Sequence, residues 1–188
     1  AGSLCILLVL VAIAVGLPAI DRTLPAERAV PPHLPYEVGG GVTVVPPAGA
    51  VLDVTRTRPT ARQGTALFVI GRVRYVIVVA PFDGDLDGAV DRLRRKVTNA
   101  DGQLDAGLPA LTGTGLTGRE GVYTTPDRAG RYAVFLAPDV SIEVTVSGTE
   151  TDLEEIEPVI EASIQTITTV GTCDHQKSGV GAPRQRAQ

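Results

Sequence analysis

Residues 65–80, TALFVIGRVRYVIVVA, form the stretch that decides the predicted fold. Every second residue from 73 to 79 is apolar, and from residue 76 onward the intervening positions are apolar as well. A strand with apolar side chains on both faces is covered on both faces, so residues 72–80 predict a central strand of a sheet. Residues 65–70 predict its neighbour, and Gly71 between the two runs predicts either a tight hairpin or a β-bulge.

Shorter elements are predicted on both sides of this pair. Residues 42–45 and 50–55 predict two short strands on the N-terminal side. On the C-terminal side a helix is predicted to begin after Asp83 or Asp85, either of which can cap it. Its apolar residues recur every three or four positions and form one stripe, which consists of Leu86, Val90, Leu93 and Val97.

The C-terminal part of the chain predicts more sheet and a second helix. Residues 121–125, 131–136 and 140–146 predict a three-stranded antiparallel meander, whose last strand alternates between an apolar face and a face open to solvent. A second amphipathic helix follows, in which residues 151–154 (TDLE) fit a capping box. Pro158 is expected either to kink this helix or to begin its main part.

Together these elements predict an α+β fold class, in which a mainly antiparallel sheet packs with two amphipathic helices. The chain divides into four predicted segments. They are a transmembrane helix at residues 1–20, a proline-rich spacer at 21–35, the globular domain at 36–170 and a disordered tail at 171–188.

The membrane prediction rests on the apolar run Leu4–Leu17 and on the position of the first charged residue, Asp21. At ~1.5 Å rise per residue, about twenty residues form a helix of roughly 30 Å, which matches the hydrocarbon core of a bilayer. This length predicts a retained single-pass anchor. The alternatives are a cleaved signal peptide, for which residues 15–19 (VGLPA) offer a poor cleavage site, and a buried core helix.

Composition disfavours several classes of function. The net charge is −4, and only 4% of the residues are aromatic, which argues against a nucleic-acid partner. Of the two cysteines, Cys5 lies in the predicted membrane segment and Cys173 in the predicted tail, so no disulfide framework is expected.

Groups for catalysis and metal binding are sparse. The two histidines, His33 and His175, fall in the predicted spacer and tail, so the predicted domain lacks the usual general base of nucleophilic catalysis. Two cysteines and two histidines at these spacings do not make a zinc site. We therefore predict no catalytic residue, no cofactor and no metal, and we keep a hydrolase with paired carboxylates as a third hypothesis.

Two motifs are formal matches only. Asp83, Asp85 and Asp87 alternate as in a Ca²⁺ loop, but the glycine and distal glutamate of an EF-hand are absent, so helix capping is the preferred interpretation. Residues 113–118 (GTGLTG) match a dinucleotide-binding pattern, yet they lie in the aperiodic stretch 99–118 rather than between a strand and a helix. That stretch is predicted to be a loop.

The one candidate contact site is a cluster of cations in the last turns of the first helix, which consists of Arg92, Arg94, Arg95 and Lys96. Cations at this position complement the negative end of the helix dipole. The second interpretation is a contact for anionic headgroups or phosphates.

The order of elements resembles the Mog1/PsbP-like α/β sandwich, which actinobacterial envelope proteins of the LpqN kind also have. The residues that carry the resemblance are the opening YEVGGGVTVVP at 36–46, which is similar to the start of uncharacterised single-pass actinobacterial membrane proteins, and the closing helix, which ends near SIQTI at 163–167. The resemblance covers residues 36–169. It implies a non-enzymatic adaptor or cargo-assisting role in the cell envelope and supplies no catalytic residues.

The sequence and the resemblance together predict a membrane-anchored accessory protein of the cell envelope. Its domain is expected outside the cytoplasm, where it binds a protein partner or scaffolds an envelope complex. The alternative is a domain that holds a lipid or another apolar ligand between helix and sheet, with the cations of residues 92–96 near the headgroup.

Overall fold

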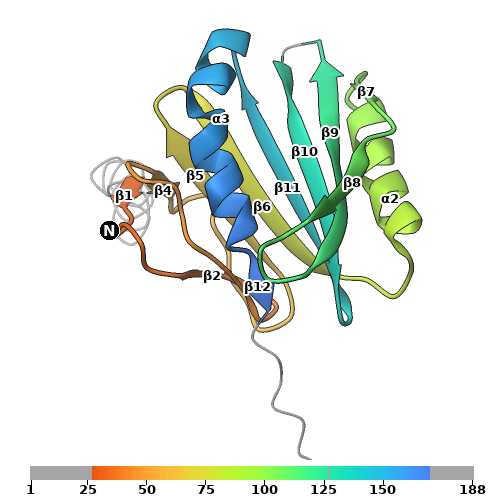
Figure 1. Ribbon diagram of the computed structural model, residues 1–188, viewed down its shortest axis with the longest axis horizontal. Helices are drawn as coiled ribbons and strands as arrows, with labels where there is room; N and C mark the ends of the chain where they lie inside the picture. Colours follow the sequence, from red (N-terminus) through yellow and green to blue (C-terminus); the bar gives the residue numbers. More distant parts are fainter. Residues whose placement is uncertain (1–26, 127, 170–188) are drawn as a thin grey trace, which may run out of the picture.

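The computed structural model describes residues 27–126 and 128–169. β6 (Val73–Pro81) lies in the middle of its large antiparallel sheet, between β5 (Gly64–Ile70) and β11 (Val140–Gly148) (Figure 1). The order of strands in this sheet is β1, β4, β5, β6, β11, β10, β9 and β7, and β8 also pairs with β9. The remaining strands are β1 (Glu27–Ala29), β4 (Val51–Asp53), β7 (Gln103–Leu104), β8 (Leu108–Leu111), β9 (Thr117–Thr125) and β10 (Arg128–Ala137).

The turn at Gly71 is a tight hairpin rather than a bulge. Ile70 pairs with Val73, so only Gly71 and Arg72 lie in the connection. Gly71 has a φ of 58°, a conformation that costs glycine little because it has no Cβ. The central pair is therefore set by a local turn, as the sequence predicted.

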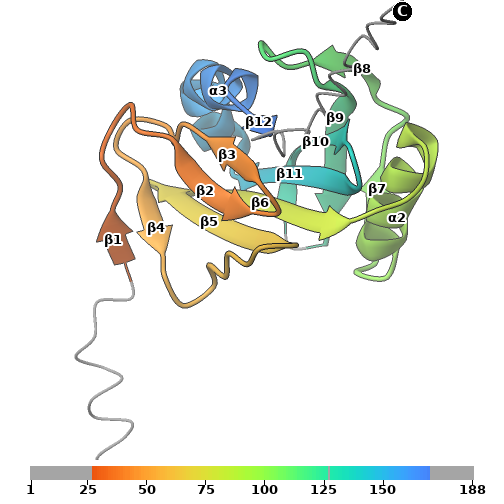
Figure 2. The same cartoon turned by 90° about the horizontal axis from the view of Figure 1, so that it is seen from below.

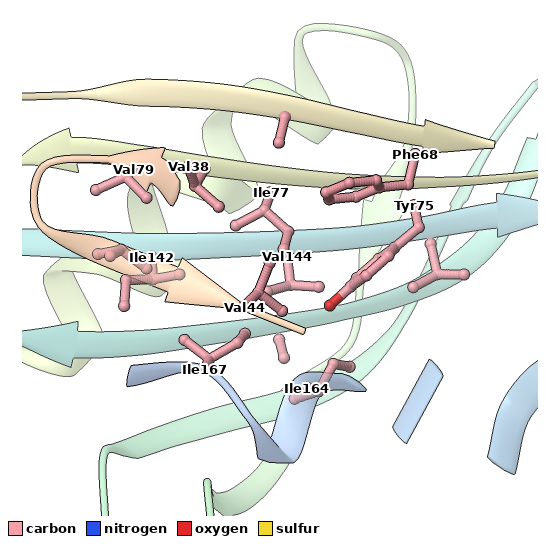
Figure 3. Packing of buried hydrophobic residues seen from close by; sticks show 14 of the residues in the cluster. Val38, Val44, Phe68, Tyr75, Ile77, Val79, Ile142, Val144, Ile164 and Ile167 are labelled. Carbon is pink, nitrogen blue, oxygen red and sulfur yellow. The ribbon is translucent and has the colours of Figure 1, made fainter. Parts of the chain in front are cut away.

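One face of the large sheet carries the main core. A small sheet and a helix cover this face: β2 (Tyr36–Gly39), β3 (Val42–Val44) and β12 (Thr168–Thr169) form the small sheet, and the helix is α3 (Glu150–Gln165) (Figure 2). Figure 3 shows side chains of both sheets and of α3 pointing toward one another. Tyr75 and Phe68 lie at the centre of this core, and the ring of Tyr36 packs edge-on against Phe68 with centroids 5.5 Å apart.

Burial of Tyr75 predicts an alkaline limit to stability. Desolvation raises the pKa of Tyr75 in the folded chain, while the same tyrosine ionises near pH 10 when unfolded. The unfolded state therefore releases a proton first, and stability is lost as the pH rises above 10. We expect the Tyr75→Phe variant to lose about 1.4 kcal/mol less per pH unit between pH 10 and 12 than the native chain, measured by urea unfolding. Parallel pH profiles of the two proteins would contradict this account.

The other face of the large sheet is partly covered by α2 (Leu86–Thr98). Asp85 caps this helix by accepting a hydrogen bond from the amide of Gly88, at 2.8 Å. The apolar stripe predicted from the sequence packs mainly against β10, where Tyr132 and Val134 are buried. The prediction that β11 has a face open to solvent was wrong, because Ser141 and Glu143 are 0% and 3% exposed.

Three local predictions need correction. The stretch 99–118, predicted as a loop, contains β7 and β8, which both pair with β9. The cap of α3 is Thr149 rather than Thr151: the amide of Asp152 donates to its hydroxyl oxygen, at 3.3 Å. Pro158 lies inside α3, which runs from 150 to 165, so the alternative in which the main part of the helix begins at this proline was wrong.

The predicted N-terminal and C-terminal segments are only partly covered by the structure. β1 lies within the predicted spacer and pairs with β4, so the sheet begins at residue 27. The predicted transmembrane helix at 1–20 and the tail at 171–188 lie outside the described residues. Within the described part of the chain, neither helix has the length and apolar character needed to cross a bilayer.

Candidate functional site

Two of the four cations predicted on α2 form ion pairs with a buried carboxylate. Arg92 Nε lies 2.9 Å from one carboxylate oxygen of Glu143, and Lys96 Nζ lies 2.6 Å from the other. Arg92 also donates to the hydroxyl of Ser141 and lies over the ring of Phe82, 5.0 Å from its centroid. These contacts tie α2 to β11, and they orient two of the four cations toward the protein.

The other two cations lie apart from that contact. Arg94 pairs with Asp91 one turn earlier on α2, and Arg95 is exposed. The four side chains therefore do not converge on one anion. A contact with headgroups at this helix stays a prediction.

A different site lies on the opposite face of the large sheet, in a groove between α3 and the sheet that we call the α3 groove. The floor comes from Ala133 on β10 and from Val144 and Val146 on β11. The wall consists of side chains of α3 that recur at helical spacing and include Leu153, Ile156 and Ile160. The floor and the wall of the groove are therefore apolar.

The rim of the α3 groove is acidic. Glu120, Glu157 and Glu161 line it, and Arg131, which pairs with Glu157, is its one lining cation among the described residues. The helix itself carries six carboxylates and no cation in its sequence ETDLEEIEPVIEASIQ. An apolar floor with an acidic rim fits a segment that is apolar on one side and basic around it.

Exposed apolar side chains extend the α3 groove toward the edge of the sheet. Leu108 on β8 pairs with Glu120 on β9, and residues directly opposite each other in a sheet share a face. Leu108 is 72% exposed, and Val122, which lies two residues after Glu120 on the same face, is 51% exposed. Exposed apolar side chains therefore also lie on β9 and on the edge strand β8 of this face, where Glu120 separates Leu108 from the floor of the groove.

The α3 groove is shallow in its present form. Its enclosed volume is about 30 Å³, enough for one or two water molecules. Pockets for drug-sized ligands measure roughly 300–1,000 Å³. The groove can thus take protruding side chains of a docked segment, whereas an acyl chain would require α3 to move.

The remaining motifs have structural roles among the described residues. Asp85 is a helix cap, and Asp87 pairs with Arg119 at 2.8 Å. The glycine-rich motif runs from the connection after β8 into the first residues of β9. The amide of Gly113 donates to the carbonyl oxygen of Gln165 at the end of α3, at 3.1 Å. The described ranges contain no group of three or more histidine, cysteine, aspartate or glutamate residues that could hold a metal ion. Cys5, Cys173 and His175 lie outside those ranges.

One feature of the sequence points to the α3 groove, although the sequence analysis did not predict a site there. This feature is the absence of lysine and arginine from residues 150–165, next to an apolar stripe. The rest of the groove comes from β9, β10 and β11, whose side chains meet α3 only in the folded domain. The position of the groove therefore followed only from the tertiary structure.

Comparisons with known proteins bear on the fold. The sequence matches no protein-family model and no curated protein. Its structure is similar to the solution structure of cyanobacterial PsbP (CyanoP) from Synechocystis sp. PCC 6803, with a TM-score of 0.52 and 12% sequence identity. The match covers 78% of this chain and 94% of that chain. At this identity the likeness shows the fold alone, and it confirms the predicted PsbP-like arrangement of a mainly antiparallel sheet with two helices.

Proposed function

We propose that this chain is a membrane-anchored accessory protein of the cell envelope, whose extracytoplasmic domain binds a partner protein in the α3 groove. The domain acts by binding and not by catalysis. The partner supplies a segment with apolar side chains flanked by lysine or arginine. The single observation behind this proposal is the apolar groove beneath Ile156, which has glutamates along its rim and the exposed Leu108 on the neighbouring edge strand.

Two physical arguments support a protein partner. Large exposed apolar patches that are surrounded by polar residues are typical of interaction sites, because leaving them in water costs free energy that docking recovers. The groove also offers an edge strand, β8, next to an apolar surface, which suits an extended or helical segment better than a compact small molecule. The predicted N-terminal helix supplies the anchoring that this proposal assumes.

The alternative of an apolar ligand between helix and sheet has weaker support. The groove lies on the side of the sheet that α3 covers, whereas the cations of α2 lie on the other side. Those cations could not serve the headgroup of a ligand bound under α3. The enclosed space is also far below the volume of a lipid chain.

The proposal is tested by photo-crosslinking of the full chain in living cells. A photoreactive amino acid is placed at Leu108 or at Ile156 in the groove, and at Leu34 or Val54, two exposed apolar residues that do not line the groove, as matched controls. We expect both groove positions to crosslink to the same protein, with at least tenfold higher yield than the controls. Equal yields at all four positions, or crosslinks to lipid alone from the groove, would contradict a protein partner.

A further inference from the structure

We propose that a second site, on the face of the large sheet opposite the α3 groove, binds the phosphate of an anionic phospholipid in the membrane that anchors the chain. The site is a hollow of about 230 Å³, which we call the arginine cleft. It is lined by Arg56, Arg74 and Arg128, by the hydroxyl-bearing residues Thr65 and Ser147, and by the apolar side chains Leu67 and Val76. The inference rests on the anchoring assumed in the proposed function.

Strand register brings these residues together from distant parts of the sequence. Arg74 on β6 pairs with Ser147 on β11, and Val76 pairs with Leu67 on β5, so all four side chains share one face. Arg128 begins β10 on the same face, two residues before Gly130, which pairs with Ser147. The face is open here because α2 covers a different part of it, around β9, β10 and the start of β11.

The electrostatics of the arginine cleft favour an anion. No carboxylate of the described residues lines the hollow itself, and none lies within 4.0 Å of the guanidinium of Arg74. Arg56 has one distant partner, Asp53, at 3.9 Å. Arginine presents a planar set of donors that matches phosphate oxygens, and the hydroxyls of Thr65 and Ser147 add neutral donors beside them.

The position of the cleft relative to the chain favours a membrane phosphate. The hollow adjoins a wider depression of about 530 Å³ that shares Arg74, Arg128 and Ser147. This depression is also lined by Arg72 and by three carboxylates, those of Asp53, Asp152 and Glu27, the first residue of β1. Only residues 21–26 separate Glu27 from the predicted transmembrane helix at 1–20. Six residues span at most about 20 Å, so the cleft lies at the end of the domain that stays close to the bilayer surface. Basic side chains held at that distance are attracted to anionic lipids.

Arginine footprinting tests the proposal without altering the protein. The full chain is inserted into nanodiscs of zwitterionic lipid or of the same lipid with one third phosphatidylglycerol, and the rate of modification by phenylglyoxal is measured for each arginine by mass spectrometry. We expect the rates at Arg74 and Arg128 to fall at least fivefold in the anionic nanodiscs, while Arg95 on α2 keeps its rate. A parallel arm adds glycerol 3-phosphate to the zwitterionic nanodiscs and separates a soluble phosphate from a lipid phosphate.

Each outcome decides the question. Protection by anionic lipid, with or without protection by glycerol 3-phosphate, supports the proposal. Protection by the soluble phosphate alone, or protection of Arg95 in place of Arg74, overturns it. A chain that fails to float with the nanodiscs refutes the anchoring, whereas an inserted chain with unprotected arginines refutes only the cleft.

A variant pair provides the matched control. Arg74→Gln and Arg95→Gln each remove one positive charge from an exposed or half-exposed side chain. If Arg74 and Arg128 share one phosphate, Arg74→Gln reduces the protection of Arg128 at least threefold and Arg95→Gln leaves it unchanged. Equal effects of the two variants would indicate attraction by overall charge and would overturn a built site.

Discussion

Replacing Gly64 by alanine is expected to cost about 3 kcal/mol of stability or more. A Cβ at Gly64 would overlap the carbonyl oxygen of Val38 and come within 2.7 Å of its carbonyl carbon. Both are backbone atoms of β2, so no side-chain rotation can relieve the overlap. The small sheet would have to move away from β5, and the core between the two sheets would open.

The measurement is urea unfolding of the Gly64→Ala variant, with Gly88→Ala as the matched control. Gly88 lies in the first turn of α2, where a Cβ would meet only the side chains of Asp85 and Phe82, at 3.1 and 3.4 Å. In a helix, alanine is preferred to glycine by about 1 kcal/mol, so this variant should lie within about 1 kcal/mol of the native chain. Similar losses in both variants would show that β2 does not approach β5 as described.

Arg92→Met is expected to destabilise the domain by about 3 kcal/mol. The side chain of Glu143 is 3% exposed, and Arg92 is the more buried of the two cations that pair with it. Removal of Arg92 leaves a buried carboxylate paired only with Lys96. The variant should therefore unfold at a lower urea concentration than the native chain, with an unchanged m-value.

Two further variants of α2 separate burial from charge. The Lys96 side chain is 53% exposed, so Lys96→Met should cost less than about 1 kcal/mol, even though it removes a partner of the same carboxylate. Arg95→Met, on the exposed side of the same helix, should change stability by less than about 0.5 kcal/mol. Equal losses for Arg92→Met and Arg95→Met would mean that Glu143 does not hold α2 to the sheet.

The predictions that succeeded depend on signals within single elements. The central pair follows from apolar alternation over residues 65–80, and α2 follows from a stripe at helical spacing with an aspartate cap. Strands β7 and β8 were missed because they are two and four residues long and are held by pairing with β9 rather than by a pattern of their own. The cap of α3 was misplaced because Thr149–Asp152 and Thr151–Glu154 fit the same capping pattern.

The candidate sites depend on contacts between elements far apart in the chain. Glu143 lies 51 residues after Arg92, so a sequence pattern cannot show that the two side chains pair. The α3 groove joins the helix at 150–165 with β9, β10 and β11 at residues 120–146, and the arginine cleft joins residues 56, 74 and 128. Each of these combinations becomes visible only when the strand order is known.

The docking of a basic partner segment in the α3 groove is tested most directly by reversing the charge of its rim. The measurement is the yield of the crosslink from Leu108 in cells. The test variant carries Glu120→Lys together with Glu161→Lys at the rim of the groove. The control variant carries Glu154→Lys together with Glu155→Lys, which changes the net charge by the same amount but lies on α3 away from the groove. We predict a yield at least tenfold lower in the first variant and unchanged in the second. Equal yields in the two variants, with both proteins folded, would contradict an acidic docking groove beneath α3.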